Sequence, residues 1–250
     1  MNNLINRQNS LTRRSFLHIA AFAGLAASTR YFPFFSDSSK LVTVRKSFPL
    51  MGTQLNLTVY SQDQDQAEAA VTATVAHMQE LEGKLSRHQQ DSEVGILNRT
   101  GLLENPSKDL QAVLELANSV NNKTAGAFDI TILPLLTLYQ KQKEQLIRQP
   151  ERIRSLVRSM GHQNLYCSSQ QIRLDRTGSG NAGITLDGIG KGYIVDQGVA
   201  SLQQFGFQQV LVEAGGDLLV KGSKPGGAPW QIGIRNPRPE IPGELLTVQV

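Results

Sequence analysis

The stretch that most constrains the fold is residues 184–196, with the sequence ITLDGIGKGYIVD. It begins as an apolar, strand-like run, continues through three glycines with Lys191 between the last two, and ends in a helix-like pattern. Glycines let backbone N–H groups approach a ligand closely, and a lysine at a helix start favours a phosphate. The stretch therefore predicts a cradle for a nucleotide-like ligand. The alternative is a tight strand-to-helix turn whose lysine is only solvated.

The composition is that of an ordinary globular protein. Of the 250 residues, 40% are hydrophobic and 18% are charged, and the net charge of +4 is not gathered into a basic run. This mild excess of cations favours anions in general and argues against nucleic-acid binding. The single cysteine, Cys167, excludes an internal disulfide framework. The four histidines are scattered without HExxH spacing, which argues against catalytic zinc.

The amino terminus resembles an export signal. Arg13 and Arg14 precede a Phe-Leu pair, a modest apolar run at residues 19–27 and a small-residue end. This order is typical of twin-arginine signals, and the apolar run is shorter than the roughly 20 residues of a membrane-spanning helix. We expect residues 1–36 to direct export to the periplasm. The alternative is an ordinary basic, amphipathic helix.

Residues 41–250 predict one α+β domain, a mixed sheet with flanking helices. Period-two alternation and apolar runs predict strands near residues 41–44, 55–60, 210–212, 230–234 and 245–250. Apolar residues at helical spacing predict helices at residues 63–85, 107–121, 150–160 and 193–205, and a short helix from Glu93. Because the chain stops inside a strand pattern, we expect the domain to be incomplete at its carboxyl end.

Three side chains outside this pattern have two interpretations each. Met51, beside a glycine, can cover a flat ring or be a core methionine at a turn. His88 faces either a ligand or solvent. Asp129, next to Phe128, either caps the helix that follows or lines a site.

Residues 178–183, GSGNAG, match the GxGxxG pattern of dinucleotide-binding proteins. That fingerprint requires a strand before it and a helix after it. A strand-like run follows instead, so we predict a Ser/Gly loop or hairpin turn.

Six segments together resemble one family, the FAD:protein FMN transferases, also called ApbE or flavin transferases. The segments are residues 51–53 (MGT), 91–98 (DSE…N), 126–135 (GAFDIT…PL), 186–196, 215–217 (GGD) and 230–237 (W…GI…P). No single segment is specific, but their order and spacing are similar to the family from about Val42 onward. The resemblance implies an ApbE-like, T-fold-related domain over residues 41–250. The sequence of residues 184–189, ITLDGI, is most similar to that of family members linked to maturation of nitrous-oxide reductase and related respiratory flavoproteins.

The resemblance implies a reaction. FAD is cut at its diphosphate, and FMN is joined to a Thr or Ser hydroxyl of an acceptor flavoprotein, with release of AMP and a requirement for Mg²⁺. Such phosphoryl transfer depends mainly on positioning and charge neutralisation. By motif position, the residues implied to contact FAD are Met51, His88, Ala127, Phe128, Asp129, Thr185 and Lys191. Gly188 is implied to offer its carbonyl oxygen to Mg²⁺. The acceptor is expected to be an exported respiratory protein, and association with the inner membrane is expected only through the signal or a membrane-bound acceptor.

The sequence departs from the family at three places. The family has Tyr at the position of His88, although His can also stack on a flavin. It has Asp at the position of Thr185, and Asp187, two residues on, is therefore a further candidate. The family's Mg²⁺-binding Asp and Thr and its activating His belong to a later segment, so we expect the general base to lie beyond residue 250 and this chain to be truncated.

Two other functions remain as alternatives. One is a catalytically inactive flavin-binding or flavin-delivery accessory protein. The other is a structural α/β domain without a ligand. An Asp-x-x-x-Thr segment at the carboxyl end of the intact gene favours the enzyme, and a natural stop at Val250 favours the accessory protein.

Overall fold

Two antiparallel hairpins form the sheet on which the domain is built. In the computed structural model, which describes residues 41–147, 149–176, 182–238 and 244–250, the strand order is β1-β2-β6-β7. The strands are β1 (Val42–Leu50), β2 (Thr53–Ser61), β6 (Val210–Ala214) and β7 (Asp217–Lys221). Leu55, Leu57 and Val59 alternate along β2 with exposures of 1% or less, as expected of a central strand facing a core.

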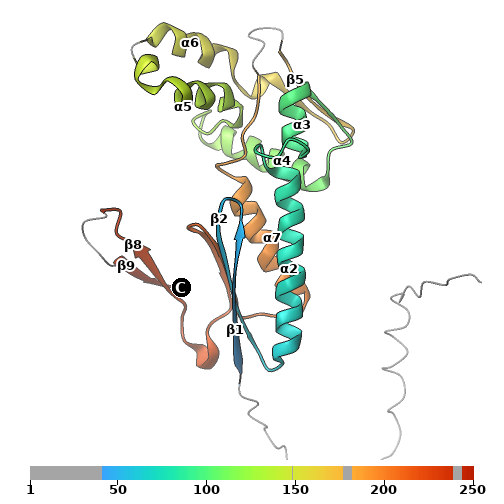
Figure 1. The fold of residues 1–250 in the computed structure, drawn as a ribbon, viewed down its shortest axis with the longest axis vertical. Helices are drawn as coiled ribbons and strands as arrows, with labels where there is room; N and C mark the ends of the chain where they lie inside the picture. The colour runs from blue at the N-terminus through green and yellow to red at the C-terminus, as the bar shows by residue number, and fades with distance from the viewer. Residues whose placement is uncertain (1–40, 148, 177–181, 239–243) are drawn as a thin grey trace, which may run out of the picture. The chain divides into compact units, whose positions relative to one another are not determined.

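Two helices, α2 (Gln64–Leu85) and α7 (Gly190–Gln204), cover one face of this sheet (Figure 1). Asp63 caps α2 by accepting a hydrogen bond from the Gln66 N–H at 3.0 Å. The helices pack closely because α7 has a glycine at the contact. A Cβ on Gly198 would lie 2.7 Å from the sulfur of Met78 on α2.

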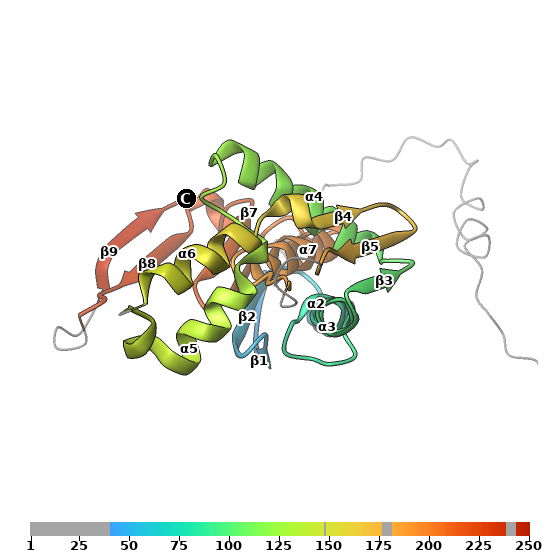
Figure 2. The same cartoon turned by 90° about the horizontal axis from the view of Figure 1, so that it is seen from above.

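A second group of elements follows α2. It contains a three-stranded sheet of order β3-β5-β4, formed by β3 (Leu102–Glu104), β5 (Gln171–Leu174) and β4 (Leu165–Cys167). Its helices are α3 (Glu93–Thr100), α4 (Lys108–Lys123), α5 (Leu133–Ile147) and α6 (Pro150–Ser159). Ser92 and Ser107 cap α3 and α4 with their side chains. Figure 2 shows α5 and α6 side by side, consistent with their direct packing.

The remaining short elements connect or follow these groups. Three 3-10 turns are η1 (Ile130–Ile132), η2 (His162–Asn164) and η3 (Pro225–Gly227). A separate ribbon pairs β8 (Gln231–Arg235) with β9 (Glu244–Gln249). Before it, the buried Trp230 donates its indole N–H to the carbonyl of Gly222 at 2.9 Å.

The α+β class with flanking helices is confirmed, and the predicted helices are present within a few residues of their expected bounds. The sheet differs from the expectation, since every strand pair among the described residues is antiparallel and none is mixed. Among these residues no helix has both the length and the apolarity needed to span a membrane. The predicted signal, residues 1–36, and most of the predicted loop at residues 178–183 lie outside the described residues.

The stretch at residues 184–196 turns into a helix, as predicted, but the apolar run at its start is not a strand of any sheet among the described residues. Residues 182–186 run extended, with residues 183–186 buried, but they pair with no strand among the described residues. Asn98 takes the place of a neighbouring strand. Its Oδ1 accepts from the Ile184 N–H at 2.7 Å and its Nδ2 donates to the Ile184 carbonyl at 2.9 Å. Helix α7 then begins at Gly190, three residues earlier than the predicted Tyr193, so Lys191 lies in its first turn.

Candidate functional site

Both hairpin turns of the main sheet lie at the same end of it. Antiparallel pairing of Leu55 with Ala214 places the start of β2 beside the end of β6. The turn after β6 must be glycine there. Gly215 has φ +57°, and a Cβ on it would lie 2.6 Å from the Thr53 hydroxyl oxygen. The turns at residues 51–52 and 215–216 are therefore neighbours.

The first turn of α7 is tied to this pair of turns by an ion pair. Lys191 Nζ lies 3.1 Å from Asp217 Oδ2, directly after the turn at residues 215–216. The Lys191 side chain is 31% exposed and the Asp217 side chain 48%, so both keep access to solvent. The two glycine-rich bends that the sequence analysis singled out thus lie together.

A pocket of about 390 Å³ opens beside these turns. Its walls come from the β1–β2 turn, from the end of α2 with the segment after it, and from residues 186–194. Four of the predicted ligand contacts line it: Met51, His88, Asp187 and Lys191. They come from three separate stretches of sequence, so tertiary structure brings them together.

Met51 occupies an unfavourable backbone position in this wall. Its φ is 53°, in the left-handed region that side chains other than those of glycine, asparagine and aspartate seldom adopt. Such a conformation costs on the order of 1–3 kcal/mol and persists where the surroundings impose it. The two-residue turn between β1 and β2 requires it, and the half-buried side chain packs against the core at the pocket.

The start of α3 fixes the loop that carries His88. The Ser92 hydroxyl lies within hydrogen-bonding distance of the carbonyl oxygens of Ser86 and Gln89, and it accepts from the Gly95 N–H at 2.8 Å. A Cβ on Gly95 would lie only 2.1 Å from the Gln89 carbonyl oxygen, so this glycine permits the close approach. His88 is therefore an exposed ring on a well-supported loop.

Asp187 is held by the neighbour of His88. Arg87 Nε and Nη2 lie 2.8 and 2.7 Å from Asp187 Oδ2. Burial alone raises the pKa of the Asp187 carboxyl, but the hydrogen bond and charge of Arg87 outweigh burial and hold that pKa below its ordinary value. The Thr185 hydroxyl accepts from the Asp187 N–H at 3.2 Å and helps to fix its backbone.

Comparison with known proteins shows the family to which this chain is similar. Residues 51–250 match the model of the ApbE family. This chain belongs to the ApbE family. It is 28% identical over 210 residues to the FAD:protein FMN transferase of Haemophilus influenzae, which covers 77% of this chain and 59% of that protein. It is 27% identical over 201 residues to the one of Vibrio cholerae, with 78% and 59% covered. The ApbE-family chain thus spans about three fifths of the length of these relatives.

Solved structures agree with the family. The flavin transferase ApbE from Vibrio cholerae matches with a TM-score of 0.65 and 25% identity, covering 84% of this chain and 68% of that one. The ApbE protein from Thermotoga maritima has the same fold, with a TM-score of 0.70 and 24% identity.

The other residues expected from the ApbE resemblance are not among those that line the pocket; they are Ala127, Phe128, Asp129, Thr185 and Gly188. Thr185 is buried behind Asp187, and Phe128 lies against Gly188, where a Cβ would be 3.3 Å from its ring. Ala127 is exposed beside it. Asp129 accepts from the N–H and hydroxyl of Thr131 at 2.8 and 2.7 Å, so it caps η1, the turn before α5, and not the helix near Leu133 that the capping alternative named.

Sequence reasoning missed the polar groups that the end of α2 contributes. Glu82, Ser86 and Gln89 line the pocket. The helical stripe that places Leu81 and Leu85 in the core also leaves Glu82 at the edge of that stripe, which is the only local signal. The ion pairs of Asp187 and Asp217 join segments that are distant in the sequence, so no local sequence pattern could predict them.

Proposed function

We propose that this chain binds FAD in the pocket between the β1–β2 turn and α7, and transfers FMN to a Thr or Ser hydroxyl of an exported respiratory flavoprotein. AMP is released and Mg²⁺ is required. The observation that carries the proposal is the meeting of Met51, His88, Asp187 and Lys191 in one pocket. The names of the relatives, FAD:protein FMN transferase, support the same substrate and reaction.

The first turn of α7 suits the diphosphate of FAD. Lys191 contributes an ammonium group, and the N–H groups of Lys191 and Gly192 have no acceptor among the described residues. Nothing lies within 4 Å of where a Cβ on Gly192 would be, so an oxyanion can approach the backbone. Free N–H groups at a helix start, with the helix dipole behind them, favour a phosphate.

The rest of the pocket suits the flavin. Met51, Leu85, Leu186 and Ile194 provide apolar walls, and His88 provides a planar ring. A volume of about 390 Å³ lies within the roughly 300–1,000 Å³ typical of small-molecule sites. The opening toward solvent at the turns leaves room for the hydroxyl of an acceptor protein.

The oxygen atoms near Gly188 are of the type that Mg²⁺ prefers. Gly188 would offer its carbonyl, and Asp187 would offer Oδ1, because Arg87 engages only Oδ2 in the described contacts. Mg²⁺ bound there would neutralise charge on the transferring phosphoryl group. Arg87 and Thr185 hold Asp187 in place, and Lys191 would bind the remaining phosphate oxygens.

Intact mass measurement tests the reaction. The protein is incubated with FAD, Mg²⁺ and a candidate acceptor, and the acceptor is expected to gain the mass of FMN. EDTA, or replacement of the acceptor Thr or Ser by Ala, is expected to abolish the gain.

A second candidate is a flavin-binding accessory protein that does not transfer FMN. It is favoured by the pairing of two carboxylates of this region with cations, Asp187 with Arg87 and Asp217 with Lys191. FAD binding by calorimetry without any mass gain on acceptors would establish this function instead.

We also propose that the twin-arginine signal at residues 1–36 directs the protein to the periplasm. The support is the order of arginine pair, apolar run and small residues. An acceptor that works in respiration outside the cytoplasm fits this location.

A further inference from the structure

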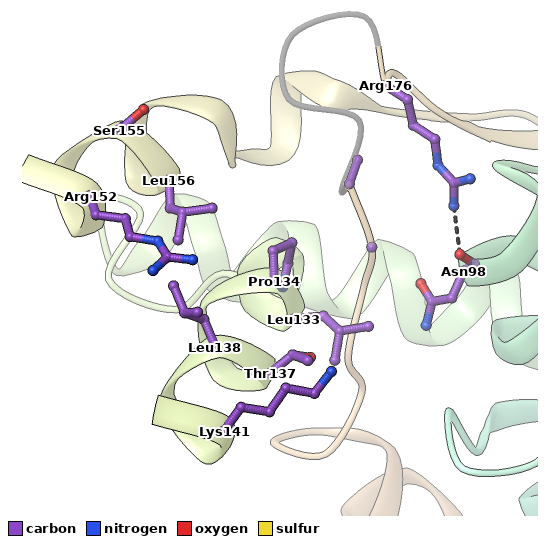
Figure 3. Close-up of a pocket in the computed structure, with 12 residues that line it drawn as sticks. Asn98, Leu133, Pro134, Thr137, Leu138, Lys141, Arg152, Ser155, Leu156 and Arg176 are labelled. Carbon is purple, nitrogen blue, oxygen red and sulfur yellow. Dashed lines mark hydrogen bonds between the residues drawn. The ribbon is translucent and has the colours of Figure 1, made fainter. Parts of the chain in front are cut away.

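A larger pocket lies at the other end of the extended segment that reaches the flavin site. Ala182 and Gly183 line it, whereas Leu186 and Asp187 of the same segment line the flavin pocket. It has a volume of about 710 Å³ and lies between α5, α6 and the end of α3 (Figure 3). We call it the cationic pocket, after its lining residues Lys141, Arg152 and Arg176.

No side chain that the structure describes balances the charges of this pocket. None of its lining residues is acidic. Arg152 Nη1 contacts the neutral amide oxygens of Gln142 and Gln149, each at 3.3 Å, and Lys141 has no ion pair with a described side chain, a set that does not include the side chains of residues 143–148. Cations facing a partly apolar cavity without counter-charges favour an anionic ligand.

Arg176 is fixed at the opposite side of the pocket from the other two cations. Its Nη1 and Nη2 donate to the carbonyl oxygens of Arg99 and Asn98 at the end of α3. Its Nε is buried and has no hydrogen-bond partner in the described part of the chain. Figure 3 shows Lys141 and Arg152 across the cavity from it.

The arrangement suits an acidic peptide better than a nucleotide. The cations are spread around the cavity, whereas one phosphate group requires donors that converge on it. The described lining contains no aromatic ring on which a base could stack. It offers instead the aliphatic side chains of Leu133, Leu138 and Leu156. A peptide that alternates acidic and apolar side chains matches both features.

One segment, residues 182–187, contributes to the walls of both the cationic pocket and the flavin pocket. Asn98 lines the cationic pocket and holds the Ile184 backbone with two hydrogen bonds. A Cβ on Gly183 would lie 3.1 Å from Leu133, so α5 packs directly on the segment. A peptide bound against Gly183 would contact the same segment that carries Asp187 four residues later, which spans at most roughly 14 Å of extended chain.

We propose that the cationic pocket binds an acidic segment of the protein that accepts FMN. The proposal rests on the proposed function, and it adds a docking site that selects acceptors by carboxylate groups next to apolar side chains. The bound segment directs the neighbouring acceptor hydroxyl toward the flavin pocket.

Fluorescence anisotropy tests the site without using the reaction. The probe is a short fluorescein-labelled peptide of alternating glutamate and leucine, compared with its glutamine counterpart. We expect the acidic peptide alone to bind, and Arg152→Glu or Lys141→Glu to weaken it about tenfold or more, the equivalent of losing one charge-assisted contact. Arg158→Glu is the matched control, since Arg158 is an exposed arginine of α6 that does not line the pocket.

Two results would overturn the docking site. One is equal binding of the glutamine peptide or unchanged binding by Arg152→Glu. The other is displacement of the peptide by AMP or inorganic phosphate with the same dependence on Arg152, which would make this a phosphate site.

Calorimetry with FAD separates this proposal from the function on which it rests. Arg152→Glu is expected to leave FAD affinity unchanged, and a loss of FAD affinity would assign the pocket to the flavin and overturn the docking site. If the wild-type protein binds no FAD, the proposed function fails, while the anisotropy result still decides whether the pocket takes an acidic peptide.

Discussion

Lys191 Nζ lies 3.1 Å from Asp217 Oδ2, so one ion pair joins the first turn of α7 to the turn between β6 and β7. The pair is partly exposed, and a phosphate can therefore compete with Asp217 for the ammonium group. In the structure Asp217 thus offsets the charge on which the proposed FAD binding depends.

We expect Lys191→Ala to weaken FAD binding about tenfold. A hydrogen bond to a charged group contributes about 1.5–3 kcal/mol, and partial exposure places this one at the lower end. Isothermal titration calorimetry measures the change, with Lys221→Ala as a control at an exposed lysine of β7. Asp217→Asn is expected to tighten binding because it removes the competitor. Unchanged affinity in Lys191→Ala would refute the phosphate contact.

Gly215→Ala is expected to lower the free energy of unfolding by about 1–3 kcal/mol, the usual cost of a strained backbone position. The alanine would have φ near +57° and its Cβ would meet Thr53. Urea denaturation gives the value. Gly226→Ala, at φ +78° with nothing within 4 Å, separates the backbone cost from the clash. If both variants lose the same stability, contact with Thr53 does not constrain this turn.

The Arg87–Asp187 pair predicts a dependence of stability on pH. With Arg87 present, the folded-state pKa of Asp187 lies below the unfolded value of about 3.9. Its contribution to stability is therefore present above about pH 4 and is lost as the pH falls through the folded-state pKa. In Arg87→Ala burial still raises that pKa, and only the weaker effects of the Thr185 hydroxyl and the charge of His88 still lower it, so the stabilising contribution of Asp187 is expected to shrink. Urea denaturation from neutral pH to below about pH 4 measures this change in stability.

Asp187→Asn is the control for that measurement. It removes the titrating group, so the added effect of Arg87→Ala on the pH profile should vanish in the double variant. A persistent effect would mean that Arg87 acts through another carboxylate.

Replacing both Arg13 and Arg14 with lysine is expected to stop export, because the twin-arginine route requires the arginine pair and not only its charge. Cell fractionation followed by immunoblotting measures the periplasmic share. Arg7→Lys, at another basic residue of the amino terminus, should leave export unchanged. Normal export of the double lysine variant would favour the basic amphipathic helix instead.

Local signals explain which elements were predictable. Asp63, Ser92 and Ser107 are capping residues followed by apolar residues at helical spacing, and each caps a helix in the structure. The start of α7 carries the opposite signal, since Gly190 and Gly192 are poor helix formers. The helix nonetheless begins there, after Gly190 N–H donates to the Leu186 carbonyl at 2.7 Å.

The site was predictable only as a set of positions. The family motifs name Met51, His88 and Lys191, but no local pattern states that they share a pocket. The partners of the two acidic residues at the site come from distant parts of the chain, with Arg87 one hundred residues before Asp187. Contacts of this kind depend on the tertiary fold and produce no periodic pattern in the sequence.

The two hydrogen bonds between the Asn98 side chain and the Ile184 backbone affect which sequence changes this segment can accept. Side chains in a paired strand must keep strict alternation, because a shift by one position turns them to the opposite face. The run at residues 182–186 pairs with no described strand, and it is held by the Asn98 amide and by the Ile130 carbonyl, which accepts from the Thr185 N–H at 2.8 Å. A shift of one residue before Asp187 would therefore not turn the side chains of a whole strand to the opposite face, so the distance between this carboxylate and the start of α7 can change while the sheets are preserved.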